Sequence, residues 1–454
     1  MHLPWSRKKK PAELRGDAKH ADGHIPRWIA FFAALGVIAA VGVVVSLFSH
    51  YGRQPDRMFA TARPGLETEE FVDALAGSVG APVESGGRAQ LQNNGVAFFP
   101  SLIAEIDRAK HSVDFMVYIW EPGKATDQVL GAMTAAAKRG VQVRLMLDGV
   151  GGNKMPEEGL ERFVAAGGRV ITFNAFTWGK ITRFYKRNHR RAIVIDGLIG
   201  YTGGQAVSDK WIGNAQNPER WHDSMVRVTG PMAISLQQVF AQSWAATVGE
   251  VLAGPAFYPD SVEAVRPGEV IAKHVNVVSS PGNDNHPLRN VFWLTFASAR
   301  HKLYIATPYF VPDQATRRIA AERARAGVDV RIMVPATDKT DAKPIAWAGQ
   351  GYYEDLLEAG VKIYEYQPTM MHAKTVVADG IWSIVGSANM DVRSDELNQE
   401  NVLGIQDAGF AAQIEQSFMA DLQKSKQLNL AEFRQRGTLV RLREKAAQLF
   451  ENQY

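Results

Sequence analysis

The longest apolar stretch of the chain lies near its N-terminus. Residues 28–49 form a run of 22 residues without a charged side chain. A helix of that length measures about 33 Å, which is enough to cross the hydrocarbon core of a bilayer. The apolar region of a cleaved signal peptide usually runs about 7–15 residues. The pattern therefore predicts a retained transmembrane helix over residues 28–49.

Beyond this stretch, helical and extended periods alternate twice. Helices are predicted over 126–139 and 313–326, each followed by a strand, over 141–147 and 328–334. The segment KRGVQVRLMLDG, from residue 138, also resembles RAGVDVRIMVPA, from residue 325. Such repetition indicates two homologous halves. We expect an α/β fold with two lobes related by a pseudo-twofold axis.

The predicted organisation is a tail, a span, a linker and two lobes. Their bounds are 1–27 for a basic cytoplasmic tail, 28–49 for the span, 50–90 for the linker, and 91–255 and 256–454 for the lobes. The final stretch, 428–454, carries leucines beside basic residues. Such a helix either packs on the second lobe, the preferred interpretation, or lies on anionic lipid.

Charge and composition narrow the possible partners. The formal net charge is +4 and the pI is near 9.0. Much of the excess lies in the N-terminal tail, so no nucleic-acid partner is expected. Seven basic residues precede the apolar stretch and three follow it within twenty residues. The positive-inside rule then places the lobes outside the inner membrane. The chain has no cysteine, which excludes disulfides and thiolate chemistry. The oligomeric state stays open.

Polar residues are regularly spaced in the segment MMHAKTVVADGIWSIVGSANM, from residue 370. An Asp-Gly pair at 379 and 380 predicts a two-residue hairpin turn. In that register His372 faces Ser387, while Lys374 projects from the same strand face as the histidine. Asn389 follows in the loop. These donors suit a bound phosphate and form no acidic metal cluster. Asp379 itself is best interpreted as a turn residue.

A second copy of this pattern occurs 183 residues earlier, in RNHRRAIVIDGLIGYTGGQA. His189 and Asp196 keep the seven-residue spacing, and Arg191 stands where the lysine stands. Gly204 and Ala206 replace the serine and the asparagine. The first copy therefore keeps an imidazole and a cation but lacks the two neutral donors.

The pattern H-x-K-x4-D-x6-G-S-x-N resembles the signature of the phospholipase D superfamily. Segments such as ATPYFVPD, from residue 306, and VGSANMDVRSDELNQE, from residue 385, resemble bacterial cardiolipin synthases. The resemblance implies that a phosphatidyl group passes between two phosphatidylglycerol molecules at the bacterial inner membrane, with release of glycerol and without a cofactor. The implied catalytic residues are His189, Arg191, Asp196, His372, Lys374 and Asp379, with Ser387 and Asn389 binding phosphate. The implied acceptors are Asp223 for His189 and Glu400 for His372.

The chemistry itself can be argued from the residues. Fixed cations and donors neutralise a phosphodiester most strongly in the transition state. One histidine can then attack phosphorus while the other moves a proton, and family precedent assigns the attack to His189. A phospholipase D hydrolase or a nuclease-branch phosphodiesterase is the alternative. A non-catalytic membrane scaffold is suggested only by Arg191 and Ala206.

Overall fold

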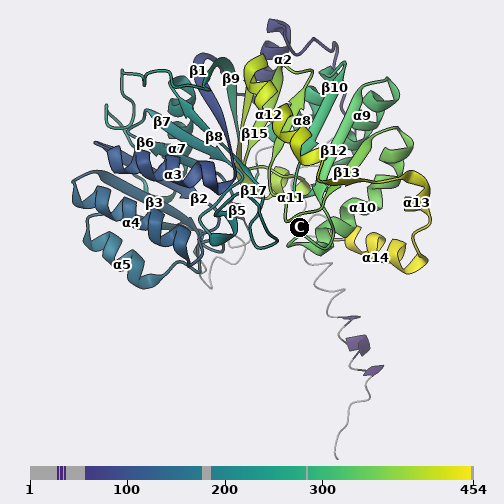
Figure 1. The fold of residues 1–454 in the computed structure, drawn as a ribbon, viewed down its shortest axis with the longest axis horizontal. Coiled ribbons are helices and arrows are strands. Elements are labelled where there is room, and N and C mark those ends of the chain that lie inside the picture. Colours follow the sequence, from purple (N-terminus) through teal and green to yellow (C-terminus); the bar gives the residue numbers. More distant parts are fainter. Residues whose placement is uncertain are drawn as a thin grey trace, which may run out of the picture. The chain divides into compact units, whose positions relative to one another are not determined.

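The computed structural model describes residues 28–29, 31–33, 35–36, 57–175, 186–282 and 285–450. The chain divides into two units, Met1–Tyr51 and Gly52–Tyr454. The predicted span falls mostly outside the described residues. Among those that are described, no helix is both long and apolar enough to cross a membrane. All elements discussed below belong to the second unit (Figure 1).

In the described part of this unit, sixteen strands form one sheet. The first half of the chain supplies neighbouring strands in the order β1-β8-β7-β6-β2-β3-β4. Their bounds are Val83–Asn93 (β1), Ser112–Val117 (β2), Gln142–Asp148 (β3), Arg169–Phe173 (β4), Ala192–Ile195 (β6), Ile199–Gly203 (β7) and Ser224–Thr229 (β8).

The second half of the chain repeats this order as β9-β17-β15-β14-β10-β12-β13, and β18 extends the edge. The two halves join where β1 pairs antiparallel with β9. The bounds are Val270–Ser279 (β9), Lys302–Ala306 (β10), Asp329–Pro335 (β12), Lys362–Tyr366 (β13), Thr375–Ala378 (β14), Trp382–Gly386 (β15), Asn398–Gln406 (β17) and Ser425–Gln427 (β18). The repeated order agrees with the internal duplication of the sequence.

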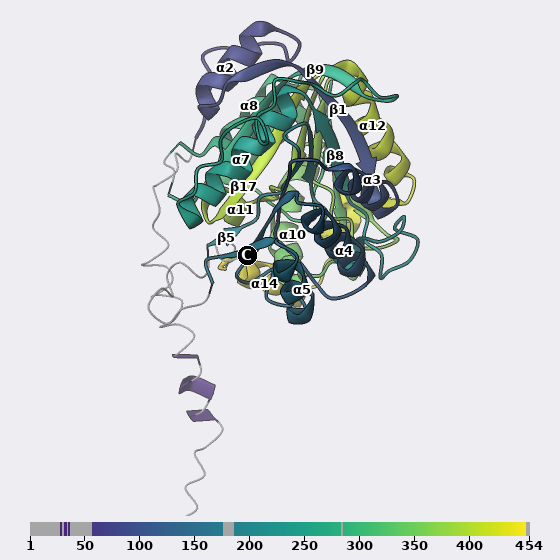
Figure 2. The ribbon, with the colours of Figure 1, turned by 90° about the vertical axis from the view of Figure 1, so that its left-hand side faces the viewer.

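Helices cover both faces of the sheet (Figures 1 and 2). In the first half, Phe115 of β2 packs in a core with α3 (Asn94–Arg108) and α4 (Lys124–Lys138). The next residue, Met116, packs on the opposite face with α7 (Pro231–Val248). Successive strand residues point to opposite faces, so β2, which is covered on both sides, is buried along its whole length. The helices of this half also include α5 (Glu157–Ala165).

The second half has the same layered arrangement. Its helices are α8 (Pro287–Ser298), α9 (Gln314–Arg325), α10 (Lys343–Glu358), α11 (Val392–Glu396), α12 (Ala408–Leu422), α13 (Leu430–Arg434) and α14 (Thr438–Gln448). The elements predicted from hydrophobic period are confirmed to within two residues. They are α4 with β3 and α9 with β12. A mixed α/β fold is therefore correct.

Residues 57–90 differ from the predicted linker. They contain α2 (Glu69–Val79) and the start of β1. Phe71, Leu75 and Val79 of α2 are buried in the core of the second half, where the Phe71 ring meets Trp382 at 5.0 Å between centroids. Their four-residue spacing makes one apolar helix face. The linker interpretation overlooked this period, because it read the stretch only as a connection between the span and the first lobe.

The C-terminal stretch forms α13 and α14, and α14 packs along α10. Ala447 of α14 is buried with Val311 and Ala348. A helix that packs on the second lobe, the preferred interpretation, is therefore confirmed.

Candidate active site

His189 lies where the two halves of the chain meet. A short strand, β5 (Arg187–Asn188), pairs parallel with the start of β17, and His189 N continues the ladder by donating to Gln399 O at 2.9 Å. His189 Nδ1 then lies 2.8 Å from Glu400 Oε1 and 2.9 Å from Oε2. Because an ionised carboxylate only accepts, Nδ1 carries the proton and Nε2 keeps its lone pair.

His372 of the second half is held in the same way by residues of the first half. Met371 bridges to His222 of the first half, and His372 N donates to His222 O at 2.6 Å. His372 Nδ1 lies 2.6 Å from Asp223 Oδ2. Trp211 Nε1 donates to the same oxygen at 2.8 Å. Each histidine is therefore oriented by a carboxylate from the other half.

The predicted acid partners were consequently exchanged. The family resemblance assigned Asp223 to His189 and Glu400 to His372, but the structure pairs Asp223 with His372 and Glu400 with His189. The reason is topological. Each histidine segment crosses to the other half before its own hairpin begins, so the carboxylate it meets belongs to that other half.

The predicted hairpin register was also wrong by one residue. Thr375 pairs with Val385 in the second hairpin, and Ile195 pairs with Ile199 in the first. Each Asp-Gly turn has positive φ at both residues, but the next residue, Leu198 or Ile381, stays outside the ladder. The loops thus contain three residues instead of two. Since a one-residue shift moves every side chain to the other face, turn length decides the pairing.

Ser387 nevertheless reaches the site, through Glu400. Its hydroxyl donates to Glu400 Oε2 at 2.5 Å. Its counterpart Gly204 has no room for such a side chain, because a Cβ there would overlap Asp223 Oδ1. The indole N–H of Trp211 binds Asp223 instead. The first motif therefore has a neutral donor, but from a residue that the sequence pattern did not identify.

The two cations occupy equivalent places. Arg191 NH1 donates to the carbonyl of His189 at 2.7 Å, and Lys374 Nζ donates to the carbonyl of His372 at 2.8 Å. Both side chains are buried. Arg191 Nε and NH2 and Asn389 Oδ1 find no partner among the described residues. A buried donor without a partner is costly, so the two free nitrogen atoms of Arg191 indicate a site for an anion with several oxygens.

Burial controls the protonation of the site. Burial and the charge of Arg191 lower the pKa of His189 to about 4, although Glu400 opposes them. Burial, and then Lys374, also lower the pKa of His372. Burial lowers the pKa of Lys374 to about 7. His189 is therefore a neutral imidazole at neutral pH, with Nε2 unprotonated, and a phosphate that binds would restore the charge of Lys374.

The two carboxyls remain ionised despite their burial. Burial raises the pKa of Asp223 and of Glu400, but the paired histidine and nearby cations outweigh it and leave each pKa below its usual value. Both therefore stay acceptors for the histidine Nδ1–H. Asn401, which follows Glu400, also links the halves, because its Oδ1 accepts from Arg191 N at 2.9 Å.

Asp196 and Asp379 lie outside this site, contrary to their predicted catalytic role. Asp196 accepts from the backbone amides of residues 110–112 at 2.7–2.9 Å. Asp379 accepts from those of residues 300–302 at 2.8–2.9 Å. Each aspartate lies just after its strand, at the end away from the histidine. Its carboxylate binds the backbone amides at the start of the neighbouring strand. The turn interpretation of Asp379 was the right one, and it extends to Asp196.

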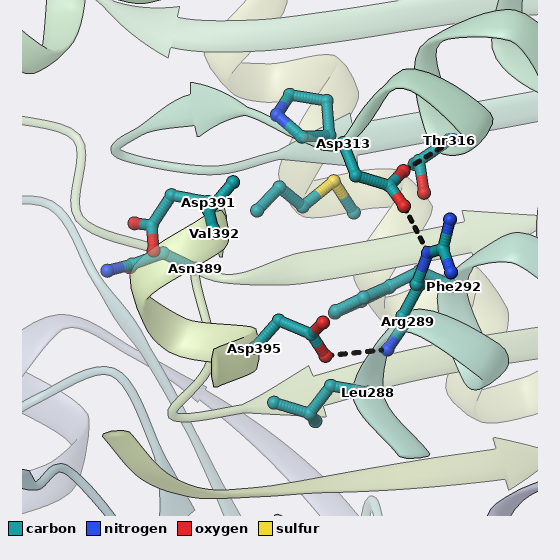
Figure 3. A pocket seen from close by; sticks show the side chains of 11 residues that line it. Leu288, Arg289, Phe292, Asp313, Thr316, Asn389, Asp391, Val392 and Asp395 are labelled. Carbon is teal, nitrogen blue, oxygen red and sulfur yellow. Dashed lines mark hydrogen bonds and ion pairs between the residues drawn. The ribbon is translucent and has the colours of Figure 1, made fainter. Parts of the chain in front are cut away.

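A pocket adjoins Asn389 in the second half (Figure 3). Arg289 Nε donates to Asp313, and Arg289 N donates to Asp395 at 3.2 Å. Burial raises the pKa of Asp391 to about 6. The pocket therefore holds an ion pair of Arg289 with Asp313, while Asp391 accepts from Ser394 N at 2.7 Å. No group of three or more potential ligands for a metal ion occurs among the described residues.

Comparison with known proteins gives one family. A model described as "Cardiolipin synthase, PLD-like domain" matches residues 102–244 and 294–422. Cardiolipin synthase 1 of Bacillus cereus is 33% identical over 80% of this chain and 72% of its own length. Cardiolipin synthase A of Serratia proteamaculans is 33% identical over 85% of this chain and 79% of its own length.

Solved structures agree on the fold. The crystal structure of phosphatidylserine synthase from Haemophilus influenzae Rd KW20 superposes with a TM-score of 0.65. It covers 85% of this chain and 100% of that chain at 15% identity, so the likeness concerns the fold alone. The duplicated sheet, the paired histidine motifs and the sequence matches lead to one conclusion: the chain belongs to the cardiolipin synthase family of phospholipase D-like proteins.

Proposed function

We propose that the chain is a phosphatidyltransferase that condenses two phosphatidylglycerol molecules into cardiolipin and glycerol. The observation that carries the proposal is the pair of buried histidines, each held through Nδ1 by a carboxylate of the other half. Two buried cations, Arg191 and Lys374, accompany them. The relatives of the chain are named cardiolipin synthases, which supports the choice of substrate.

The first half-reaction forms a bond between His189 and phosphorus. Arg191 and Lys374 hold the anionic phosphodiester, and His189 Nε2 attacks with its lone pair. The bond from phosphorus to the leaving glycerol oxygen breaks, and His372 supplies the proton to that oxygen. The low pKa of His189, about 4, keeps the nucleophile unprotonated. The negative charge of the bound lipid raises the pKa of His372 and favours the acid form that this step needs.

The second half-reaction releases the phosphatidyl group. The terminal hydroxyl of a second phosphatidylglycerol gives its proton to His372, and its oxygen attacks phosphorus as the bond to His189 breaks. Cardiolipin leaves and both histidines return to their starting state. Water in place of the lipid hydroxyl would give phosphatidic acid, so the outcome depends on which acceptor reaches the intermediate first.

An activated substrate separates the two histidines. His372→Ala, given the p-nitrophenyl ester of phosphatidic acid, needs no acid for the first step and should accumulate a phosphatidyl adduct on His189. The adduct should be stable in base, labile in acid and visible by mass spectrometry. His189→Ala should form none. An adduct on His372 in His189→Ala, with none in the reverse variant, would exchange the roles.

Lipid analysis tests the overall reaction. Wild-type protein in vesicles that contain phosphatidylglycerol should yield cardiolipin and glycerol in equal amounts. Phosphatidic acid as the sole lipid product would instead make the chain a hydrolase, and cleavage of DNA but not of lipid would make it a nuclease-branch phosphodiesterase.

We further propose that residues 28–49 anchor the chain in the inner membrane with the folded part in the periplasm. The charge-free run and the excess of basic residues before it support this orientation. Alkaline phosphatase fused after residue 454 should be active, because this reporter works only outside the cytoplasm. An inactive fusion, together with an active cytoplasmic reporter at the same position, would reverse the orientation.

A further inference from the structure

The last helix of the second half, α14, presents apolar side chains to solvent. Leu439 and Leu442 are 81% and 63% exposed, and Leu449, the C-cap residue, and Phe450, the next residue, are 83% and 44% exposed. Its packed face is separate, because Ala447 and Glu444 are the buried residues of α14. Packing on the second lobe therefore leaves these side chains unexplained.

These exposed side chains lie on one stripe. With about 100° of rotation per residue, Leu439, Leu442 and Leu449 fall within an arc of roughly 80°. Ala447 falls outside that arc, on the side that packs on α10. An apolar stripe on the solvent side of a helix that is already packed is a feature of helices that lie in a membrane interface.

Basic side chains border the stripe. Arg443 lies along one edge and Lys445 along the other, with Arg441 farther round on the Lys445 side, and all three are exposed. Arg443 also stacks on Trp347 of α10 at 4.3 Å. The exposed residues of α14 include no acidic side chain, because Glu444 is buried and binds Arg436 at 3.1 Å. The charge around the stripe therefore complements an anionic surface.

We propose that α14 is a docking surface for an anionic lipid bilayer, with its leucines in the acyl boundary and its basic residues against the headgroups. Both ribbon views place α14 and β5 on the side away from α2 (Figures 1 and 2). His189 directly follows β5, so a bilayer on α14 would lie toward the end of the sheet where the histidines meet. The surface would bring that end to its lipid substrate, independently of any anchor at residues 28–49.

A fluorescence measurement tests the contact without requiring turnover. The chain has no cysteine, so Leu442→Cys can be labelled alone with an environment-sensitive dye in the full chain. Val262→Cys is the matched control, since Val262 is 61% exposed and Leu442 is 63% exposed. In vesicles of phosphatidylglycerol and phosphatidylcholine, the dye at 442 should shift to shorter wavelength and be quenched by nitroxide-labelled lipid, whereas the dye at 262 should do neither.

Two results would overturn the proposal. Emission at 442 that stays like that in water would exclude insertion. A shift that is insensitive to lipid quenchers and grows with protein concentration would show that a second copy of the chain covers the stripe. Weaker quenching in pure phosphatidylcholine than in the mixed vesicles is expected, because the basic border contributes only with anionic lipid.

A kinetic measurement then rests on the proposed function. The triple variant Leu439→Gln, Leu442→Gln, Leu449→Gln should raise the apparent KM for vesicular phosphatidylglycerol by roughly tenfold. It should leave turnover of dispersed short-chain phosphatidylglycerol unchanged. Val251→Gln, Val262→Gln, Val265→Gln is the matched control. Equal losses on both substrates would contradict a docking role. A wild-type chain without any transfer activity would refute the proposed function, and the dye would still decide the docking.

Discussion

The two histidine motifs are built differently but arrive at the same geometry. In the second motif, Ser387 donates to the long carboxylate Glu400. In the first, a glycine at 204 leaves room for the carboxylate of Asp223, and Trp211 supplies the donor. Each carboxylate nevertheless receives a neutral hydrogen bond besides its histidine. The two halves therefore keep the same hydrogen-bond roles where they meet, although the residue types that fill those roles differ.

The cations differ in the same way. Arg191 and Lys374 both bind the carbonyl oxygen of their own histidine. Arg191 is a planar fork with two further nitrogen atoms that have no partner within the described chain, whereas Lys374 is a point charge with a pKa near 7. Arginine stays charged in this buried place and lysine becomes titratable, so the departure from the family lysine changes the pH response of one half of the site only.

The largest expected effect comes from removing the first cation. Arg191→Ala should lower kcat/KM for phosphatidylglycerol by roughly 10²–10³-fold, as expected when a transition-state donor is removed. Arg191→Lys should retain most of the activity, because the charge stays and only the fork is lost. Initial rates in phosphatidylglycerol vesicles measure both. Full activity in Arg191→Ala would mean that Lys374 alone binds the phosphate.

Giving the first motif the serine of the second should lower activity. Gly204→Ser adds a Cβ that collides with Asp223, so His372 loses its fixed acceptor and activity should fall by roughly 10–100-fold. Ser387→Ala only deletes a donor to Glu400 and should cost roughly tenfold or less. Ser387→Gly removes the Cβ as well as the hydroxyl, so it controls for the volume of the side chain. A Gly204→Ser variant as active as wild type would show that Asp223 can move without harm.

These contacts mark how far sequence could predict the site. Hydrophobic period gave α4, β3, α9 and β12, because amphipathic spacing is a local property. The duplicated spacing located both histidines and both cations. The choice of carboxylate for each histidine could not be predicted, since it depends on a crossing of the chain between the halves that leaves no local signal. Trp211 was missed because it lies in a short 3-10 helix just beyond the end of the first motif, where no position of the spaced pattern identifies it as a donor.

The strand register of the two hairpins was mispredicted for a different reason, because a local signal was present but was interpreted too simply. The Asp-Gly pairs at both turns do take positive φ, as a two-residue turn requires. The residue after each glycine remains in the loop, however, and this choice depends on the pairing of the flanking strands. In α2, by contrast, the apolar period was present in the sequence and was overlooked.

The pH profile should expose the difference between the cations. Lys374 is charged below its pKa of about 7 and loses its charge above it, so kcat/KM should fall on the alkaline side of pH 7. His189 gains a proton only near pH 4, so the acid limb should lie there. Lys374→Arg should move the alkaline limb upward, whereas Arg191→Lys should add a second alkaline ionisation. An alkaline limb that does not move in Lys374→Arg would assign it to another group.

The smallest effect on activity is expected from the turn aspartates, where the two halves are most alike. Asp196 and Asp379 each accept from three consecutive backbone amides and adopt φ of 54° and 51°. Alanine at either position would leave the backbone amides without their acceptor and occupy a left-handed conformation, so it should lower the free energy of unfolding by about 1–3 kcal/mol. Asparagine tolerates that conformation and keeps one acceptor, so it should cost less.

Because both carboxylates lie at the strand ends remote from the histidines, kcat of the folded Asn variants should match wild type within about twofold, well below the 10²–10⁴-fold loss expected for a proton-transfer group. Urea unfolding measures the first quantity and vesicle assays the second. Equal changes in unfolding free energy and in kcat for Asp196→Asn and Asp379→Asn would show that the two halves are equivalent at the turns, so that their differences lie at the site where the halves meet. A hundredfold loss of kcat in either stably folded variant would return that aspartate to the catalytic machinery.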